Sequence, residues 1–557
     1  MERGAGEEFE RIFARKVDSL VSFLEKGRLP LYAIFAYVLI TALIRDFSEY
    51  FLLDQEFINT SHPWIFSIAH HVSFYAVVFL GLVLLLSAFS GRGVRRSINF
   101  ITTFWWIIIL PPFLDHFIGG LDHNYEYFSP TDFVDAILHF SGKGFHIGQA
   151  TEVVIILFAI FAYAIWTQRH QLQTIRGRVA SFLKVAFLVL FTLIAMFVMA
   201  TPGAFLPVGS SGGVPVFPAF DLTKYHQFHL FLVAYYLLLG VALFYAILYL
   251  ANKDKFSNII RSMRLPQTLF FGIIVAAGIV VSWGNSSDLT LIADILQRPL
   301  WVNLGFAVVS IVPAILAWQA STMWNDISDR HIDEPRERRT LVRGVMGVGT
   351  LLQLSMILVT VSILLAALLS IEQVFIMLAI YGLAYAYSFR PIRFKERVLS
   401  PLLMGLGTFL AFLYGSLTPY SEILFFTGDP PIPYLTGEVI NPLLTMEGLI
   451  IGVFCFAGLV IGSMVMDIEG YEEDKRGKVR TVYTALGLKD GKTLLAVLIF
   501  LASLLPLLLF QRPMDVIFPL LGVTASLLFL RTSSPRPVMV LSFIGLVYAA
   551  IRYLGAL

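Results

Sequence analysis

Residues 300–333 of the chain read LWVNLGFAVVSIVPAILAWQASTMWNDISDRHID. The first 25 of these residues include no charged side chain, and the nine that follow include Asp326, Asp329 and Asp333. A run of about 20 apolar residues crosses the hydrocarbon core of a bilayer as a helix, because a helix satisfies every backbone polar group internally. We therefore expect residues 300–324 to form a transmembrane helix that ends in a cluster of carboxylates.

The whole chain has the composition of a membrane protein. Of its 557 residues, 57% are hydrophobic and 14% are charged, whereas a soluble domain has about 45–50% apolar and about 25% charged residues. The sequence predicts an all-α polytopic membrane protein with about fifteen spans, six in the first half and nine in the second. The spans lie at roughly 30–53, 65–90, 98–115, 149–166, 180–202, 227–251, 267–284, 300–324, 345–368, 371–389, 399–418, 446–466, 493–510, 514–531 and 536–556.

Charge and cysteine content exclude several other classes. The net charge is +2 and there is no basic tail, so nothing points to a nucleic-acid partner. The single cysteine, Cys455, excludes a disulfide framework and a cysteine-rich metal site. The N-terminus is charged from its start and does not resemble a cleaved secretory signal, so we expect residues 1–29 to form a cytoplasmic amphipathic helix.

The basic residues predict the orientation of the spans. With the N-terminus inside, the alternate inner segments contain 34 of the 40 lysines and arginines, as the preference for positive charge on the cytoplasmic side requires. We expect a multi-pass protein of the cell membrane with a cytoplasmic N-terminus, an external C-terminus, and the acidic motifs on the cytoplasmic side.

Two membrane modules differ in their polar residues. Ten of the eleven histidines precede residue 255, and the acid-rich inner loops all follow residue 320. We therefore expect a histidine-rich module of six spans at 30–254 and a second module of nine spans at 255–557.

The acidic end of the eighth span has the spacing of a metal site. Asp326, Asp329 and Asp333 lie at i, i+3 and i+7, so on a helix they share one face. Three like charges on one face repel each other unless a cation lies between them, and carboxylate oxygens suit Mg²⁺. The alternative is a solvated acidic helix end, neutralised by the arginines that follow at Arg330, Arg336, Arg338 and Arg339.

Two further inner loops carry complementary groups. Asp467 and Asp474 are again i and i+7, with Tyr471 between them and a basic run from Lys475 onward. Carboxylates for a metal beside cations for anionic oxygens describe a metal–diphosphate site. A third inner loop adds Tyr387 and four cations, Arg390, Arg393, Lys395 and Arg397. The alternative for these cations is the ordinary excess of positive charge in cytoplasmic loops.

At these motifs, residues 255–557 resemble the UbiA-type intramembrane prenyltransferase superfamily, whose members also have nine spans. The family's motifs match in order at Asn325, Asp326, Asp329, Asp333 and Gly344; at Tyr387, Ser388, Pro391, Arg393 and Lys395; and at Asp467, Glu469, Gly470, Gly477, Thr481, Leu486 and Gly487. The chain departs from the family at Tyr471 and Met464, where many members have aspartates. Glu472, Glu473 or Asp474 could substitute for them, and Asp474 is the better candidate on helical geometry.

The resemblance implies a Mg²⁺-dependent enzyme that moves a polyprenyl group from its diphosphate to a lipophilic acceptor, such as a quinone precursor or an isoprenyl-glycerol lipid, among membrane lipids. It implies that Mg²⁺ binds to Asp326, Asp329, Asp333, Asp467 and Asp474, and that Asn325 orients a metal-bound water or a phosphate oxygen. The candidates for the diphosphate are Arg339, Arg343, Tyr387, Arg393, Lys395, Tyr471 and Lys475.

Two other functions fit a membrane protein with acidic clusters. A cation-handling transporter should bury ionisable residues near the midplane, whereas these acids cluster at span ends. A catalytically inactive, lipid-binding member of the superfamily is the other alternative, because of Tyr471 and Met464.

The first module has histidines beside carboxylates, as in Asp115-His116 and Asp122-His123, and the His70-His71 pair inside a span. Imidazoles with neighbouring carboxylates hold transition metals or haem. His70, His71, His116 and His123 are therefore candidates for a second metal or haem site. The alternative is a structural or partner-docking module.

Overall fold

The structure is a computed structural model. It describes residues 2–27, 29–53, 64–119, 128–139, 146–169, 174–202, 222–253, 256–257, 260, 263–284, 300–329, 347–426, 446–476 and 479–554. Within these residues every regular element is a helix, as the sequence predicts. The chain divides into two compact units: unit 1 contains residues 1–259 and 300–305, and unit 2 contains residues 260–299 and 306–557.

Fourteen helices in the described part of the chain are long and apolar enough to cross a membrane. A fifteenth apolar helix is α11 (Leu265–Gly284). Its side chains are described without a gap only over Gln267–Ser282, and this stretch is shorter than each of the fourteen spans. The prediction of about fifteen spans is therefore close. The orientation of the termini stays a prediction.

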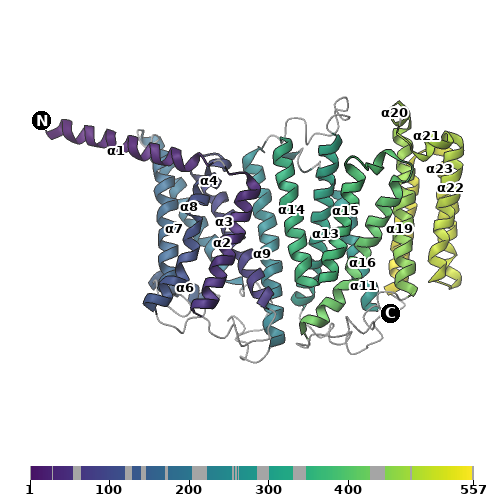
Figure 1. The fold of residues 1–557 in the computed structure, drawn as a ribbon, viewed down its shortest axis with the longest axis horizontal. Coiled ribbons are helices and arrows are strands. Elements are labelled where there is room, and N and C mark those ends of the chain that lie inside the picture. The colour runs from purple at the N-terminus through teal and green to yellow at the C-terminus, as the bar shows by residue number, and fades with distance from the viewer. Residues whose placement is uncertain are drawn as a thin grey trace. The chain divides into compact units, whose positions relative to one another are not determined.

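Unit 1 is built around α3 (Figure 1), on which α2, α4, α8 and α9 pack. Its elements are α1 (Glu2–Glu25), α2 (Leu31–Leu52), α3 (Trp64–Phe89), α4 (Val94–Phe104), η2 (Trp105–Ile109), α5 (Leu110–Leu114), the π-helical turn η3 (Asp115–Gly119), α6 (Pro130–His139), α7 (Ile147–Gln168), α8 (Ile175–Ala200) and α9 (Leu222–Ala251).

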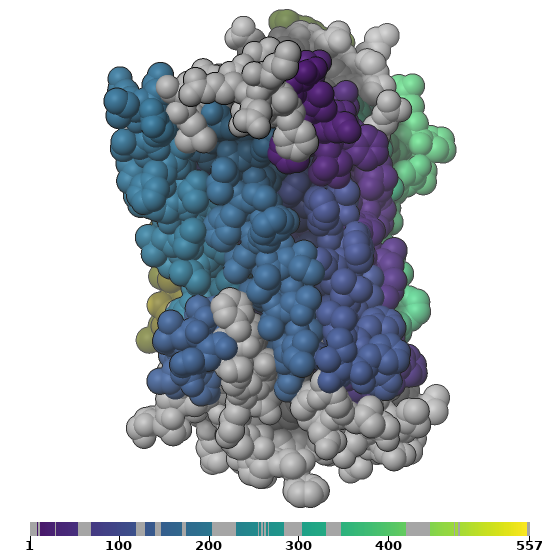
Figure 2. Space-filling view, turned by 90° about the vertical axis from the view of Figure 1, so that its left-hand side faces the viewer, coloured from purple at the N-terminus to yellow at the C-terminus, as the bar shows by residue number. Residues whose placement is uncertain are grey.

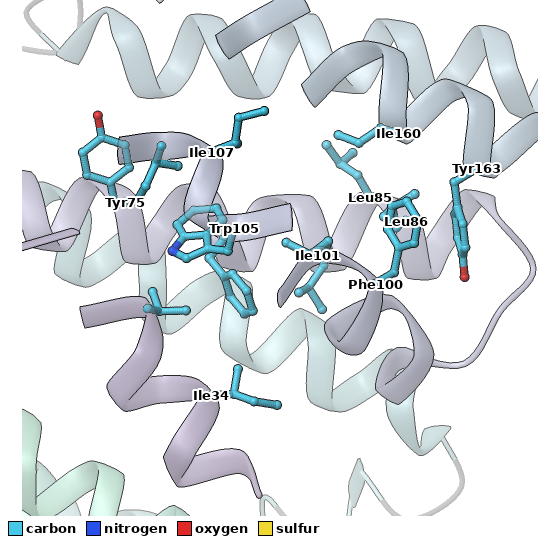
Figure 3. Packing of buried hydrophobic residues seen from close by; sticks show 14 of the residues in the cluster. Ile34, Tyr75, Leu85, Leu86, Phe100, Ile101, Trp105, Ile107, Ile160 and Tyr163 are labelled. Atoms are coloured by element: carbon cyan, nitrogen blue, oxygen red, sulfur yellow. The ribbon is translucent and has the colours of Figure 1, made fainter. Parts of the chain in front are cut away.

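The core of unit 1 is aromatic and branched (Figure 3). Trp105 is buried, and its ring lies edge-on to Phe79 with 5.1 Å between the ring centroids. The ring centroids of Phe100 and Tyr163 are 4.1 Å apart. Aromatic pairs at these separations add to the free energy of burial. The predicted span at 98–115 is therefore anchored at its centre, although it passes from α-helix to 3₁₀-helix and on to a π-helical turn.

One face of unit 1 is open to lipid. In α7 and α8 only 17% of the residues in the most apolar stretch are buried, and the exposed side chains include Phe158, Phe182 and Leu190. Figure 2 views this face, along which α7 and α8 (blue) run. Apolar side chains remain exposed on a spanning helix because lipid, and not water, covers them.

Unit 2 contains α11, α13 (Leu300–Asp329), α14 (Val348–Leu369), α15 (Ile371–Ser388), η7 (Phe394–Glu396), α16 (Ser400–Phe426), α19 (Met446–Met466), η8 (Asp467–Gly470), α20 (Tyr471–Arg476), α21 (Val482–Leu486), α22 (Leu488–Leu504), η9 (Leu505–Leu508), η10 (Pro513–Val516), α23 (Ile517–Thr532) and α24 (Pro535–Leu554). The first six residues of α13 group with unit 1.

Two glycines bring α11 and α16 together. A Cβ added to Gly278 of α11 would overlap the backbone of α16 at Phe412, and one added to Gly415 of α16 would overlap the backbone of α11 at Val275. Small residues allow spanning helices to approach closely and to gain packing energy that the lipid does not supply. This close crossing positions α16 beside α11 in the unit that contains the acidic motifs.

Candidate functional site

The loop after α15 turns back onto the acidic end of α13. Arg393 is in the left-handed region, with φ 35° and ψ 64°, and its N–H donates to the carbonyl of Phe389 at 2.8 Å. This turn directs two cations at one carboxylate: Arg393 Nη2 lies 3.1 Å from Asp329 Oδ1, and Lys395 Nζ also donates to Asp329. The middle motif and the first motif therefore meet in space.

The charges at this meeting point are buried. Asp329 is 2% exposed, and a carboxylate removed from water is stable only when it is paired. Burial also lowers the pKa of the Lys395 ammonium to about 8. The nearby carboxylates of Glu396 and Asp326 act in the opposite direction and raise this pKa, but burial has the larger effect. Lys395 Nζ lies 3.4 Å from Asn325 Oδ1 as well. One lysine therefore links the first and last residues of the Asn-Asp-x-x-Asp motif, Asn325 and Asp329.

A third cation approaches the first motif from the residue before α11. Arg264, which directly precedes α11 and has φ 47°, places Nη2 at 3.1 Å from Asp326 Oδ1. In the sequence, Arg264 is only one of several basic residues in an inner loop. No spacing relates it to Asp326, 62 residues later, so a one-dimensional pattern offers no signal for this contact.

The second acidic motif follows α19 as the turn η8 and the short helix α20. The N–H of Val479 donates to the carbonyl of Asp474 at 2.9 Å, and the N–H of Arg480 donates to the carbonyl of Glu396 at 3.3 Å. Thr481 then caps α21 through a reciprocal pair of hydrogen bonds with Thr484. These bonds tie the second motif to the middle loop.

A cavity of about 790 Å³ joins the three motifs. Its polar lining comes from the ends of four helices and their loops, and it includes Arg264, Asn325, Asp329, Tyr387, Ser388, Arg390, Lys395, Glu396, Arg397, Asp467, Asp474, Arg480 and Thr481. Its apolar lining lies further along the same helices and includes Phe271, Ala314, Ala317, Trp318, Ile380, Leu383, Leu403, Met404, Gly407 and Ala411.

The cavity is therefore amphipathic along its length. From Asp329 to Ala314 the lining follows α13 for fifteen residues, which is about 22 Å of helix at 1.5 Å per residue. Phe271 and Trp318 lie stacked on its apolar part, with ring centroids 4.3 Å apart and an interplanar angle of 22°. The arrangement suits a ligand with an anionic head and an apolar tail.

The predicted site residues fall into three groups. Asn325, Asp329, Tyr387, Lys395, Asp467 and Asp474 line the cavity, and Asp326 and Arg393 join it through their ion pairs with Arg264 and Asp329. Tyr471 instead packs against the apolar cluster of Val465, Tyr483 and Phe529, and Lys475 lies 5.8 Å from its ring. Asp333, Arg339 and Arg343 lie outside the described residues.

The donor chemistry of the cavity fits Mg²⁺. Its acids, Asp329, Asp467 and Asp474 with Asp326 beside them, offer the hard oxygen ligands that Mg²⁺ prefers. Within the described residues, no three Asp, Glu, His or Cys side chains lie close enough to hold a metal ion. Asp326 and Asp329 are paired with cations instead.

The histidines of unit 1 form a different arrangement. His71 Nδ1 contacts Asp46, His70 and His71 have ring centroids 3.9 Å apart, and His116 Nδ1 bonds the carbonyl of Leu52 at 2.9 Å. His123 lies outside the described residues. Since no three His, Cys, Asp or Glu side chains among the described residues lie close enough to hold a metal ion, the predicted second metal site has no support from the structure, and the haem alternative stays a prediction.

Comparison with known proteins gives one family match. The model of the UbiA prenyltransferase family matches residues 265–536. No curated protein matches the chain. Residues 1–264 lie outside the family match.

Three solved structures are similar over 54% of the chain. A structure of digeranylgeranylglyceryl phosphate synthase is 17% identical, with 96% of its own chain covered and a TM-score of 0.38. A UbiA homologue from Archaeoglobus fulgidus is 17% identical, with 98% covered and a TM-score of 0.34. A UbiA homologue from the same organism, bound to DMAPP and Mg²⁺, is 16% identical, with 99% covered and a TM-score of 0.35.

Proposed function

Because residues 265–536 belong to the UbiA prenyltransferase family, we propose that this membrane protein transfers a polyprenyl group from its diphosphate to a lipophilic acceptor in the unit 2 cavity. The observation that carries the proposal is that all three motifs border one amphipathic cavity. In the reaction the allylic C–O bond of the donor breaks, a bond from the acceptor to that carbon forms, and the acceptor loses a proton while diphosphate leaves.

The polar end of the cavity binds the diphosphate. Lys395, Arg480 and Arg264 line it, and charge-assisted hydrogen bonds from such groups to phosphate oxygens are short and strong. Mg²⁺ held by Asp326, Asp329, Asp467 and Asp474 would neutralise the charge that develops on the leaving diphosphate. Lys395, which lines the cavity and contacts Asp329, is a further candidate to contact phosphate oxygens, and Arg393 holds Asp329 in place through its ion pair at 3.1 Å.

The apolar part of the cavity holds the prenyl chain. Water must be kept from the reacting carbon, because it would capture the allylic cation as the alcohol. Trp318 and Phe271 contribute stacked rings to the wall of this part. Ala314, Ala317 and Gly407 also line it, and these small residues leave room for the prenyl chain. The acceptor is a lipophilic molecule, such as a quinone precursor or an isoprenyl-glycerol lipid.

The test is diphosphate release by purified full-length protein supplied with farnesyl or geranylgeranyl diphosphate and a lipid extract. We expect release that requires Mg²⁺, stops with EDTA, and yields a prenylated lipid detectable by mass spectrometry. Asp467→Asn should reduce the release at least about a hundredfold, since it removes a charged group from the site of developing charge.

Asp490→Asn is the matched control, because Asp490 is exposed in the first turn of α22 and should leave the rate unchanged. If folded protein released no diphosphate from these or longer donors, the enzyme proposal would be wrong. Binding of the donor without turnover would then favour the inactive, lipid-binding alternative.

A further inference from the structure

The N-terminal helix α1 has two apolar stripes with different surroundings. Val17, Val21 and Leu24, spaced i, i+4 and i+7, pack against the core of unit 1. Beside them, Ile12, Phe13, Leu20 and Phe23 are exposed by 46%, 53%, 55% and 75% of their surface. The bundle therefore covers only part of the apolar face of α1.

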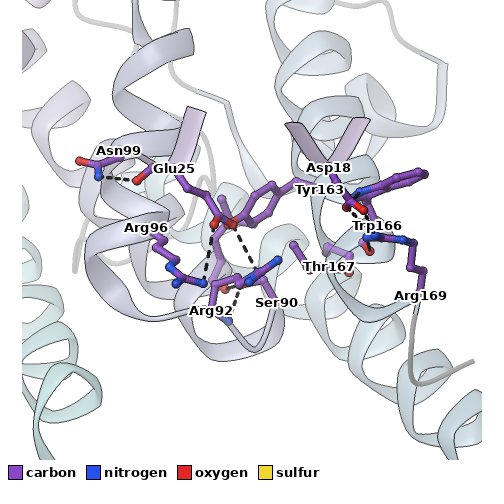
Figure 4. A network of polar contacts seen from close by, with 12 residues as sticks. Asp18, Glu25, Ser90, Arg92, Arg96, Asn99, Tyr163, Trp166, Thr167 and Arg169 are labelled. Atoms are coloured by element: carbon purple, nitrogen blue, oxygen red, sulfur yellow. Dashed lines mark hydrogen bonds and ion pairs between the residues drawn. The ribbon is translucent and has the colours of Figure 1, made fainter. Parts of the chain in front are cut away.

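A network of polar contacts holds the C-terminal half of α1 (Figure 4). Asp18 pairs with Arg169 and accepts from Trp166 Nε1 at 3.1 Å. Glu25 pairs with Arg92 at 3.3 Å and accepts from the hydroxyl of Tyr163 at 2.8 Å. These residues belong to α7 and its end, and to the turn between α3 and α4, so the direction of α1 is set by unit 1 itself.

The turn after α1 is equally confined. Asn99 Nδ2 donates to the carbonyls of Glu25 at 2.8 Å and Gly27 at 3.2 Å. A Cβ at Gly27 would lie 2.8 Å from Asn99 Cγ, so a larger residue would displace this bond. Within unit 1, α1 consequently runs across the ends of the spans and not along them (Figure 1).

The surroundings of α1 are those of a membrane surface. Trp166, at the end of α7, has its ring edge-on to Phe13 at 6.2 Å and the guanidinium of Arg169 over its face at 4.4 Å. Tryptophan at the end of a span is typical of the headgroup region. An amphipathic helix that lies across span ends at this level faces lipid with its apolar side.

We propose that α1 is an interfacial helix that inserts Ile12, Phe13, Leu20 and Phe23 into the bilayer leaflet at its end of the spans, the cytoplasmic leaflet in the predicted orientation. Residues 1–29 contain six basic and six acidic residues. Without net charge, the attraction to anionic lipid that basic segments show is missing. The helix therefore binds lipid through apolar area, and anionic lipid is not required.

The experiment measures the depth of single nitroxide labels on the full-length protein in vesicles. Cys455→Ser removes the native cysteine, and labels are placed at Phe13→Cys and Leu20→Cys on the exposed apolar stripe. Glu8→Cys and Arg15→Cys, with the same seven-residue spacing on the polar side, are the matched controls. Collision rates with oxygen and with a water-soluble nickel chelate are recorded in phosphatidylcholine, with and without phosphatidylglycerol.

The expected result is high oxygen and low nickel accessibility at positions 13 and 20, the reverse at positions 8 and 15, and the same values in both lipids. Equal nickel accessibility at all four positions would overturn the proposal. Spin–spin broadening between copies at positions 13 and 20 would identify a second copy as the occupant. Insertion only with phosphatidylglycerol would refute the apolar mechanism. None of these outcomes depends on prenyl transfer.

Discussion

The two units of the protein use buried charges in different ways. In unit 1, Asp46 and Arg45 lie inside the packed bundle, where Asp46 contacts His71 and Arg45 contacts Glu49. In unit 2, Asp329 is buried just as deeply but borders a cavity of about 790 Å³. Burial and ion pairing alone therefore do not mark a ligand site, and the cavity beside Asp329 is the additional observation in unit 2.

The strongest test exchanges one aspartate for asparagine in each unit. Asp329→Asn should lower prenyl transfer at least about a hundredfold, since a charge facing the cavity is lost. Asp46→Asn should destabilise the protein by about 1–3 kcal/mol, because a buried partner of His71 is weakened, and should leave the transfer rate of the folded protein near wild type. Rates and melting temperatures of both variants check this, and the reverse pattern would remove the contrast between the units.

Lys395 allows the same comparison for a cation. Lys395→Met should lower prenyl transfer between about tenfold and a hundredfold, because in the proposed function the variant loses a charge that binds the diphosphate. Lys492→Met is the control, since Lys492 lies outside the cavity lining and donates to Ser533 at 2.9 Å. Steady-state kinetics with varied donor would show the loss, and equal rates for the two variants would exclude Lys395 from the site.

Gly148 tests the tight packing around Asp115 in unit 1. Its N–H donates to the buried Asp115 at 2.6 Å, and a Cβ there would overlap Pro111 and the Asp115 carboxylate. Gly148→Ala should destabilise the protein by about 1–3 kcal/mol through overpacking without changing donor affinity. Gly81→Ala, where the nearest atom would be 3.9 Å away, should not change the melting temperature. A similar shift in both variants would contradict the packing argument.

Gly407 tests the open volume of unit 2. A Cβ there meets nothing within 4 Å and Gly407 lines the cavity, so Gly407→Leu should narrow its apolar part. The variant's preference for geranylgeranyl over farnesyl diphosphate should fall about tenfold. Gly382→Leu is the control, because Gly382 has equal space but does not line the cavity. Competition between the two donors measures the ratio, and no change would remove the prenyl chain from this space.

Several features of the site followed from local sequence. Apolar runs of sufficient length predicted the helices, including α13 and its acidic end. The spacing of Asp326 and Asp329 placed both on the last turns of one helix, because three residues are nearly one helical turn. The seven-residue spacing of Asp467 and Asp474 was a less direct guide, since η8 interrupts the helix between them, yet both line the cavity.

Other features depend on how distant segments pack. Tyr471 lies between Asp467 and Asp474 in the sequence, but it packs against the apolar cluster that includes Tyr483 and Phe529. The spacing of the motif does not predict this position. The contact of Arg264 with Asp326 requires α11 and α13 to be placed first. The space beside Gly407 is open because the neighbouring helices leave it free, and the identity of residue 407 alone does not predict this space.

The sequence by itself determined that the chain spans a membrane many times, that its second half carries the motifs of a prenyltransferase family, and that α1 is amphipathic. These properties depend on residues within a few turns of each other along one helix. Only the tertiary structure decided which carboxylates border a cavity, which cations reach them, and which stripe of α1 remains uncovered. Those properties depend on contacts between residues 60 or more positions apart, such as Arg393 with Asp329 and Asp18 with Arg169, which exist only after the helices have packed.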